Sequence, residues 1–176
     1  MSTIPAMIYT SRFELRPIGI DDVSPRYAGW LSDLASSQFI TAKLDLVGLR
    51  QYVLERSGRE DVIFLGIFEK ITGLHIGNIK YEPVNSEKGY AVMGILIGEE
   101  DWRGKGVAVE VISASAEWLR IHRNITAIIL GVDRANLAAI SAYQKLGFIE
   151  ELSMFVPPAS PEGKTMVWHL CPSNHL

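Results

Sequence analysis

A strand followed by a glycine-rich turn and a long amphipathic helix is the feature that most restricts the fold of this chain. The apolar run AVMGILIG occupies residues 91–98, the turn EEDWRGKG follows it, and residues 107–122 repeat apolar side chains at helical spacing. A second apolar run, AIILGVD at 127–133, returns after the helix. This order predicts a strand–helix–strand crossover within one sheet. The helix is expected to bury one stripe of side chains: Ala108, Val111, Ile112, Ser115 and Leu119.

The segments before this unit predict a meander of strands with two helices. Apolar runs and turn signals indicate strands at 13–18, 62–70 and 75–84. The carboxylates of Asp21 and Asp22 are expected to cap a helix over VSPRYAGWLSD, and Leu46–Arg56 reads as a second helix with Leu46, Leu49, Val53 and Leu54 near one face.

The segments after it predict a helix and a terminal hairpin. The helix is expected over 137–147, ended by Gly147, and the strands over FIEELSMFV (148–156) and TMVWHL (165–170). The whole order predicts an α/β fold with a mixed, mostly antiparallel central sheet of about seven strands flanked by about four helices. No repeat or linker divides the chain, so residues 1–176 are expected to form a single domain.

The composition excludes several classes of function. A net charge of −3 gives no broad attraction for a phosphate backbone, so we expect no nucleic-acid partner. No apolar run approaches the roughly 18 residues of a membrane span. The lone Cys171 and an amino terminus without a signal-peptide pattern favour a cytoplasmic protein. The four histidines lack close ligand partners, so no metal site is expected.

The loop DWRGKG is suited to binding an anion. Where a strand enters a helix through glycines, unpaired backbone N–H groups point out at the positive end of the helix dipole, and Arg103 and Lys105 add charge. The alternative is a tight turn with two solvated cations. The spacing fits neither the Walker phosphate loop nor the dinucleotide fingerprint, so a different nucleotide-bearing ligand is implied.

Two segments together resemble the GNAT superfamily of acyl-CoA N-acyltransferases. Residues 103–108, RGKGVA, are similar to its R/Q-x-x-G-x-G/A pyrophosphate loop, and residues 136–148, NLAAISAYQKLGF, to its later N-x-x-A-x-x-x-Y-x-K-x-G-F segment. The resemblance implies acetyl-CoA as acyl donor and a sheet splayed between the fourth and fifth strands. It also implies donor-binding residues: Ile97, Arg103, Gly104, Lys105, Gly106, Val107, Ala108, Asn136 and Tyr143.

Within this resemblance, each residue has a distinct role. The amides of residues 104 and 106–108 hold the pyrophosphate, the strand ending near Ile97 pairs with the pantetheine arm, and Arg103 and Lys105 assist. Tyr143 is implied as the acid at the departing sulfur, with a packed helix tyrosine as the alternative. Asn136 is a ligand-side amide, an N-cap, or both.

The general base is less clearly marked. An alkyl ammonium has a pKa of roughly 10, so a base or a desolvating pocket must supply the free amine. We expect Glu82 to act as this base, and a water relay is the alternative. Other acids and one histidine lie on or beyond strands that face the cleft, and each also reads as a solvated or structural residue: Glu99, Glu100, Asp101, Asp133 and His75.

Residues in the first third of the chain indicate which class of amine is the acceptor. Residues 26–33, RYAGWLSD, are similar to the Y-x-x-W-L-N-D stretch of the branch with ribosomal-protein amino-terminal and amino-sugar N-acetyltransferases, with Ser32 where Asn is usual. Tyr27 and Trp30 are candidates for substrate binding, or core residues. The resemblance implies an amino sugar, with a nucleotide-linked sugar included.

Three alternatives stay open at this point. The acceptor is alternatively a peptide amino terminus or a polyamine, and the chain is alternatively a non-catalytic acyl-CoA-binding regulator. Direct transfer without an acyl-enzyme is expected, because Cys171 lies in no nucleophile motif. The last two strands offer a surface for a homodimer, which the sequence does not decide.

Overall fold

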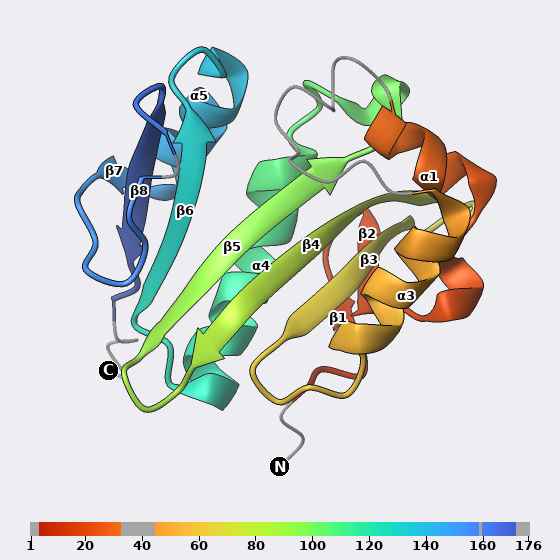
Figure 1. The fold of residues 1–176 in the computed structure, drawn as a ribbon, viewed down its shortest axis with the longest axis horizontal. Coiled ribbons are helices and arrows are strands. Elements are labelled where there is room, and N and C mark those ends of the chain that lie inside the picture. The colour runs from red at the N-terminus through yellow and green to blue at the C-terminus, as the bar shows by residue number, and fades with distance from the viewer. Residues whose placement is uncertain (1–3, 33–44, 159, 172–176) are drawn as a thin grey trace.

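The computed structural model describes residues 4–32, 45–158 and 160–171. In these residues the chain forms one eight-stranded sheet in the order β1-β2-β3-β4-β5-β6-β8-β7 (Figure 1). The α/β class and the mostly antiparallel sheet are as predicted. The strands are β1 (Ile8–Tyr9), β2 (Phe13–Pro17), β3 (Ile63–Glu69), β4 (His75–Asn85), β5 (Tyr90–Ile97), β6 (Ala127–Asp133), β7 (Ile149–Glu150) and β8 (Gly163–His169).

Helices cover both faces of the sheet. Figure 1 shows α1 and α3 in front of β2–β4, and α4 behind the sheet. Tyr27 and Trp30 of α1 pack with Leu49 and Val53 of α3 in one apolar cluster, while α4 contributes to the larger core. The helices are α1 (Pro25–Ser32), α3 (Leu46–Arg56), α4 (Val107–Arg123) and α5 (Leu137–Leu146), with 3-10 turns η1 (Ile20–Asp22) and η2 (Glu100–Trp102).

The pairing between β5 and β6 is parallel and short. It joins Tyr90–Val92 to Ala127–Ile129 and then stops, while β4 remains paired with β5 as far as Ile97. Beyond Val92 the two strands diverge, and Figure 1 shows the gap that opens between them. These are the fourth and fifth strands expected from the sequence, so the predicted crossover and splay are confirmed.

The core behind the sheet is fixed by the buried stripe of α4. Val111, Ile112 and Leu119 are fully buried as predicted, whereas Ala108 is only partly buried. The buried hydroxyl of Tyr81 on β4 lies 2.8 Å from the Oγ of Ser115, which donates its own proton to the carbonyl of Val111. Tyr81 therefore donates to Ser115, and the pair ties the sheet to the helix.

Four local predictions were wrong. Only Ile149–Glu150 of the expected strand 148–156 pairs in the sheet, because the chain then leaves it and Phe155 stacks on Tyr90 with the ring centroids 4.1 Å apart. The short β1 was missed, which makes eight strands.

The cap of α1 also differs from the prediction. Ser24, and not Asp21 or Asp22, caps this helix by accepting from the amide of Tyr27. Asp22 is instead paired with Arg16 and the amide of Gly19, and the side chain of Leu54 is exposed.

The Tyr81–Ser115 contact predicts a stability effect. Replacing Ser115 with Ala leaves a buried phenol without an acceptor, which should lower the free energy of unfolding by about 1–3 kcal/mol. Urea unfolding measures this. The double variant with Tyr81→Phe should recover part of the loss, since the unpaired hydroxyl is gone; a double variant less stable by the sum of the single losses would contradict the assignment.

Candidate active site

Two glycines face each other across the gap between β5 and β6. The pairing between β5 and β6 ends at Val92 and Ile129, and Gly94 and Gly131 each lie two residues beyond these positions. Both are exposed, and a Cβ added at either would meet nothing within 4 Å. The face of the sheet over both glycines is therefore open, with no side chain covering it.

The loop after β5 is tied back to the end of that strand. The guanidinium of Arg103 donates to the carbonyl of Ile97 at 3.1 Å and to the carbonyl of Gly98 at 3.0 Å. Gly104 and Gly106 adopt φ angles of 70° and 75°, a left-handed conformation that favours glycine. Arg103, expected to assist an anion, thus has a structural contact with the strand that the sequence did not reveal.

The amino end of α4 presents free backbone donors. Among the described residues, the amides of Gly104, Lys105, Gly106, Val107 and Ala108 donate to no acceptor. Because α4 begins at Val107, these amides lie at the positive end of its dipole. The residues present therefore fit a bound phosphate or pyrophosphate, as the sequence predicted.

A network from the start of the chain supports this loop. Glu110, in the first turn of α4, accepts from the Thr10 hydroxyl at 2.7 Å and from the amide and Nε of Arg12 at 2.8 Å each. The Nη2 of Arg12 also donates to the carbonyl of Lys105 at 3.0 Å. Sequence reasoning missed this network, because nothing local links Thr10 and Arg12 to residues about a hundred positions away.

Tyr143 and Asn136 lie on α5, which follows β6. Tyr143 is 9% exposed, and burial raises the pKa of its phenol to about 12. Among the described residues its hydroxyl has no hydrogen-bond partner, and its ring packs against Phe148. Asn136 accepts from the amide of Ala139 at 3.2 Å, so its N-cap role is confirmed. Tyr143 is thus a protonated phenol at neutral pH.

Tyr27 and Trp30 belong to α1, and their side chains lie in the apolar cluster that α1 shares with α3. They are 3% and 5% exposed, and the ring of Trp30 lies so close to Gly98 that a Cβ there would be 1.9 Å from it. The Nε1 of Trp30 donates to Glu99 at 3.0 Å. Trp30 therefore packs on the residues that follow β5, and Tyr27 packs beside it with the ring centroids 5.4 Å apart. Asp33, the last residue of the motif that carried them, lies outside the described residues.

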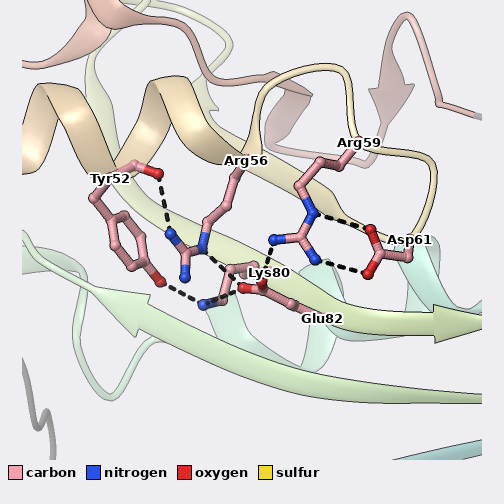
Figure 2. Close-up of polar contacts among 6 residues, drawn as sticks. All are labelled: Tyr52, Arg56, Arg59, Asp61, Lys80 and Glu82. Carbon is pink, nitrogen blue, oxygen red and sulfur yellow. Dashed lines mark hydrogen bonds and ion pairs between the residues drawn. The ribbon is translucent and has the colours of Figure 1, made fainter.

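Glu82 lies in a network of charges on β4 and α3, and Figure 2 shows it. Its carboxylate accepts from Arg56 Nε at 2.8 Å, from Arg59 Nη1 at 3.0 Å and from Lys80 Nζ at 3.0 Å. Burial opposes the ionisation of Glu82, but the hydrogen bonds from Lys80 and Arg56 outweigh it and hold the pKa of the carboxyl below its ordinary value. A low pKa weakens a base, so this geometry weighs against the predicted role of Glu82, which stays a prediction.

Three of the other candidate bases already have contacts or low basicity. Glu99 is engaged by Trp30 and lies 3.6 Å from Arg26. Burial lowers the pKa of His75, which contacts Asn78 at 2.8 Å. Asp133 accepts from the amide of Ala135 at 2.7 Å. Glu100 and Asp101 lie in η2, beyond the end of β5.

A cavity of about 190 Å³ lies over the paired ends of β5 and β6. Tyr90, Ala127 and Ile129 line it together with Phe155, Val167 and Lys88. These three strand residues lie on the same face of the sheet as Gly94 and Gly131, at the end where the two strands are still paired. In the described parts of the chain no group of three or more His, Cys, Asp or Glu could hold a metal ion, and no helix is long and apolar enough to cross a membrane.

The ion pairs of Glu82 predict a pH-dependent stability. Glu82→Gln should lower the free energy of unfolding at pH 7 by about 1–3 kcal/mol, since it leaves Arg56 and Lys80 without their carboxylate. The folded pKa of Glu82 lies below the ordinary 4.5, so the stabilisation is present above pH 4.5 and is lost as pH falls through the folded pKa. Denaturant unfolding from pH 7 to pH 3 checks this.

Glu117→Gln is the control, because Glu117 lies in an exposed ion pair with Arg120. This variant should change the free energy of unfolding by about 0.5 kcal/mol or less. An equal loss in both variants would contradict the prediction.

Comparison with known proteins agrees with this geometry. A curated relative, "Uncharacterized N-acetyltransferase YobR" of Bacillus subtilis (strain 168), is 37% identical over 60 residues, which is 34% of this chain and only 24% of the relative's length. Among solved structures, a spermidine N-acetyltransferase SpeG chimera from Vibrio cholerae and hSSAT superposes with a TM-score of 0.77 at 20% identity, covering 90% of this chain and 96% of that one.

A second structure extends the similarity of fold. RimL, a ribosomal L7/L12 alpha-N-protein acetyltransferase in complex with coenzyme A, has a TM-score of 0.79 at 14% identity, covering 93% of this chain and 98% of that one. The model of the acetyltransferase (GNAT) domain matches residues 12–149, most of the chain. The protein therefore belongs to the GNAT family of acetyltransferases.

Proposed function

We propose that this protein is an N-acetyltransferase that moves an acetyl group from acetyl-CoA to a primary amine by direct attack. The observation that carries the proposal is the gap between β5 and β6, with Gly94 and Gly131 open on both sides and free amides at the start of α4. Membership of the GNAT family supports it. We further propose that residues 1–176 form a single catalytic domain that works in the cytoplasm, as a monomer or as a homodimer.

Acetyl-CoA, the acyl donor, has proposed binding groups at the start of α4 and along the edge of β5. The amides of Gly104, Gly106, Val107 and Ala108 take the pyrophosphate, and Lys105 adds charge beside it. The edge of β5 beyond Val92 has lost its partner strand, so the backbone up to Ile97 pairs with the pantetheine amides as an added strand would. Arg103 keeps the loop and the strand end in register. Asn136 acts through its cap on α5.

The chemistry needs a proton donor at sulfur and a free amine. In the transfer the amine nitrogen bonds to the acyl carbon, the carbon–sulfur bond breaks, and the sulfur leaves as a thiolate. Tyr143, held neutral by burial, gives its proton to that sulfur, and the proton that the bonded nitrogen loses as the amide forms restores the phenol. Removal of the proton from the ammonium is assigned to Glu82 or to a water relay. The ion pairs of Glu82 favour the relay.

The acceptor is proposed to be an amino sugar, including one linked to a nucleotide. The cavity over the paired ends of β5 and β6 supports this, because it is lined by Tyr90 and Phe155, whose rings stack on each other. Aromatic faces suit a sugar or nucleoside ring. The similar structures act on spermidine and on a protein amino terminus by their names, so these acceptors remain alternatives. A non-catalytic acyl-CoA-binding regulator is the alternative to an enzyme.

The loop assignment predicts a loss of donor affinity. Gly106→Val should weaken acetyl-CoA binding by at least about tenfold, since a branched side chain opposes φ near 75° and blocks close approach to the amides. Isothermal titration calorimetry measures this. Gly73→Val is the control, because Gly73 has a φ of 71° and lies in a distant hairpin turn, where an added Cβ would meet nothing within 4 Å. Equal affinity of the two variants would remove the loop from the donor site.

Tyr143 predicts a loss of turnover without a loss of binding. Tyr143→Phe should lower kcat by about 10²-fold with little change in acetyl-CoA affinity, because the ring stays and the proton is lost. The pKa near 12 also means that Tyr143 does not titrate in a pH–rate profile below about pH 11. Tyr9→Phe, at an exposed tyrosine, is the control. Unaltered kcat in Tyr143→Phe would exclude the acid role.

Enzyme activity is tested directly by release of the CoA thiol. Acetyl-CoA is supplied with an amino sugar, a peptide with a free amino terminus, spermidine, or no amine. Release that depends on an amine supports the proposed function and shows the acceptor class. Release equal to the no-amine control in every case, with acetyl-CoA binding intact, favours the regulator.

A further inference from the structure

The charged network of Figure 2 lies directly beside the open space of the gap. Lys80 on β4 and Gly94 on β5 are opposite each other in the antiparallel pairing. Opposite residues in such a pair project to the same face with about 5 Å between their Cβ positions, so the side chain of Lys80 rises next to the void over Gly94. The network of Lys80, Glu82, Arg56 and Tyr52 therefore borders the face where the amine must arrive.

This network has an excess of positive charge. Arg59 and Asp61 form a bidentate pair at 2.7 and 3.0 Å, which leaves Arg56 and Lys80 against the single carboxylate of Glu82. Arg56, Lys80 and Glu82 have side chains only 19%, 26% and 18% exposed, so solvent screens them weakly. One positive charge is left uncompensated in a half-buried position.

Unused donors accompany this charge. The oxygen of Tyr52 contacts Lys80 Nζ, and the Tyr52 hydroxyl proton has no acceptor among the described residues. Arg56 uses Nε on Glu82 and Nη1 on the carbonyl of Tyr52, which leaves Nη2 without an acceptor there. Two residues before Lys80, on the same face of β4, Asn78 is 4% exposed and its Nδ2 has no partner. A buried donor without an acceptor, such as the Nδ2 of Asn78, is rare. The partly exposed donors of Tyr52 and Arg56 are free to bind a ligand that accepts hydrogen bonds.

The strands on either side of the gap carry few charges. Segment 90–97 of β5 contains no charged residue, and the charged residue of β6 is Asp133, two residues beyond Gly131 on the same face, whose carboxylate accepts from the amide of Ala135 at 2.7 Å. On the cavity side Lys88 lies 5.8 Å from the ring centre of Phe155, and Glu151 is engaged by His169 at 2.8 Å. Next to Gly94, on the β4 side of the gap, the excess charge among the described residues is therefore that of Arg56 and Lys80 over Glu82.

We propose that the acceptor is a small amine that carries a phosphate or carboxylate, and that Lys80, Arg56 and Tyr52 bind this anionic group while the amine reaches the gap. The inference rests on the proposed function and narrows its acceptor. A nucleotide-linked or phosphorylated amino sugar has the required anion, whereas a polyamine brings further positive charge to a positive face.

Matched amines test the preference for an anion. The kcat/KM for acetylation is compared between glucosamine 6-phosphate and glucosamine, between alanine and alaninamide, and with spermidine. The expected result is that at least one anionic member is preferred by about tenfold, the contribution of one charge-assisted hydrogen bond, and the pair that shows it tells phosphate from carboxylate. Equal rates within both pairs, or a preference for spermidine, would overturn the inference and leave the proposed function standing.

Variants connect the preference to the network. Lys80→Met keeps the length of the side chain and removes its charge, so it should reduce the preference for the anionic member to about one. Lys70→Met, at an exposed lysine on the turn after β3, is the control and should keep it. Because Lys80 also holds Glu82, Tyr52→Phe provides a second test that keeps every charge of the network and removes only the hydroxyl, which accepts from Lys80 and offers its own proton. It should lower the preference while the melting temperature stays close to that of the parent. A preference unchanged in both network variants would overturn the assignment.

A binding measurement separates this inference from catalysis. N-acetylglucosamine 6-phosphate and N-acetylglucosamine, with the N-acetylated forms of the alanine pair, are titrated by calorimetry into the protein saturated with CoA. Tighter binding of an anionic product, lost in Lys80→Met, supports the inference even where no amine is turned over. Equal or no binding within both pairs would overturn it, whatever the outcome of the activity assay.

Discussion

The early end of the β5–β6 pairing is the constraint on which the rest of the structure depends. After Val92 and Ile129 each strand keeps one partner and loses the other, so a row of backbone N–H and C=O groups faces an internal gap. Such groups need water or a ligand as partners. A ligand with amides of its own can pair with this edge as a strand would. Gly94 and Gly131 leave the face of the sheet beside the gap free of side chains, so the proposed donor site follows from the sheet itself.

Each half of the sheet is held open by contacts of its own. On one side β2–β5 form a continuous antiparallel ladder, and Tyr81 joins it to α4 through Ser115. On the other side β6 pairs with β8 along its whole length, and Tyr143 of α5 packs in the core together with Phe148, which follows the helix. The network of Glu110 and Arg12 then fixes the loop at the mouth of the gap. Because neither half needs the other beyond Val92, the gap does not depend on a ligand to keep its shape.

The sequence predicted what depends on local pattern and missed what depends on distant pairing. Most strands and helices followed from apolar periodicity and turn residues, and the glycines before α4 indicated an anion site. The opposition of Gly94 and Gly131 depends on register, and the contact of Arg12 with Glu110 joins segments 98 residues apart. The expected strand at 148–156 failed because pattern alone cannot say that Phe155 finds Tyr90 instead of a neighbouring strand. Likewise, Glu82 resembles any carboxylate near a cleft until its three cations are known.

Those three cations bear on both the identity of the general base and the identity of the acceptor. An isolated carboxylate beside Gly94 would both take up a proton and attract a cationic acceptor. Paired with Arg56, Arg59 and Lys80, Glu82 loses basicity, and the face around it becomes positive. The same ion pairs therefore argue for a water relay in place of direct proton removal and for an anion on the acceptor. A cationic face also lowers the pKa of a nearby ammonium, because like charge disfavours the protonated form. The free amine that the reaction needs is then favoured by the charges that bind the rest of the substrate.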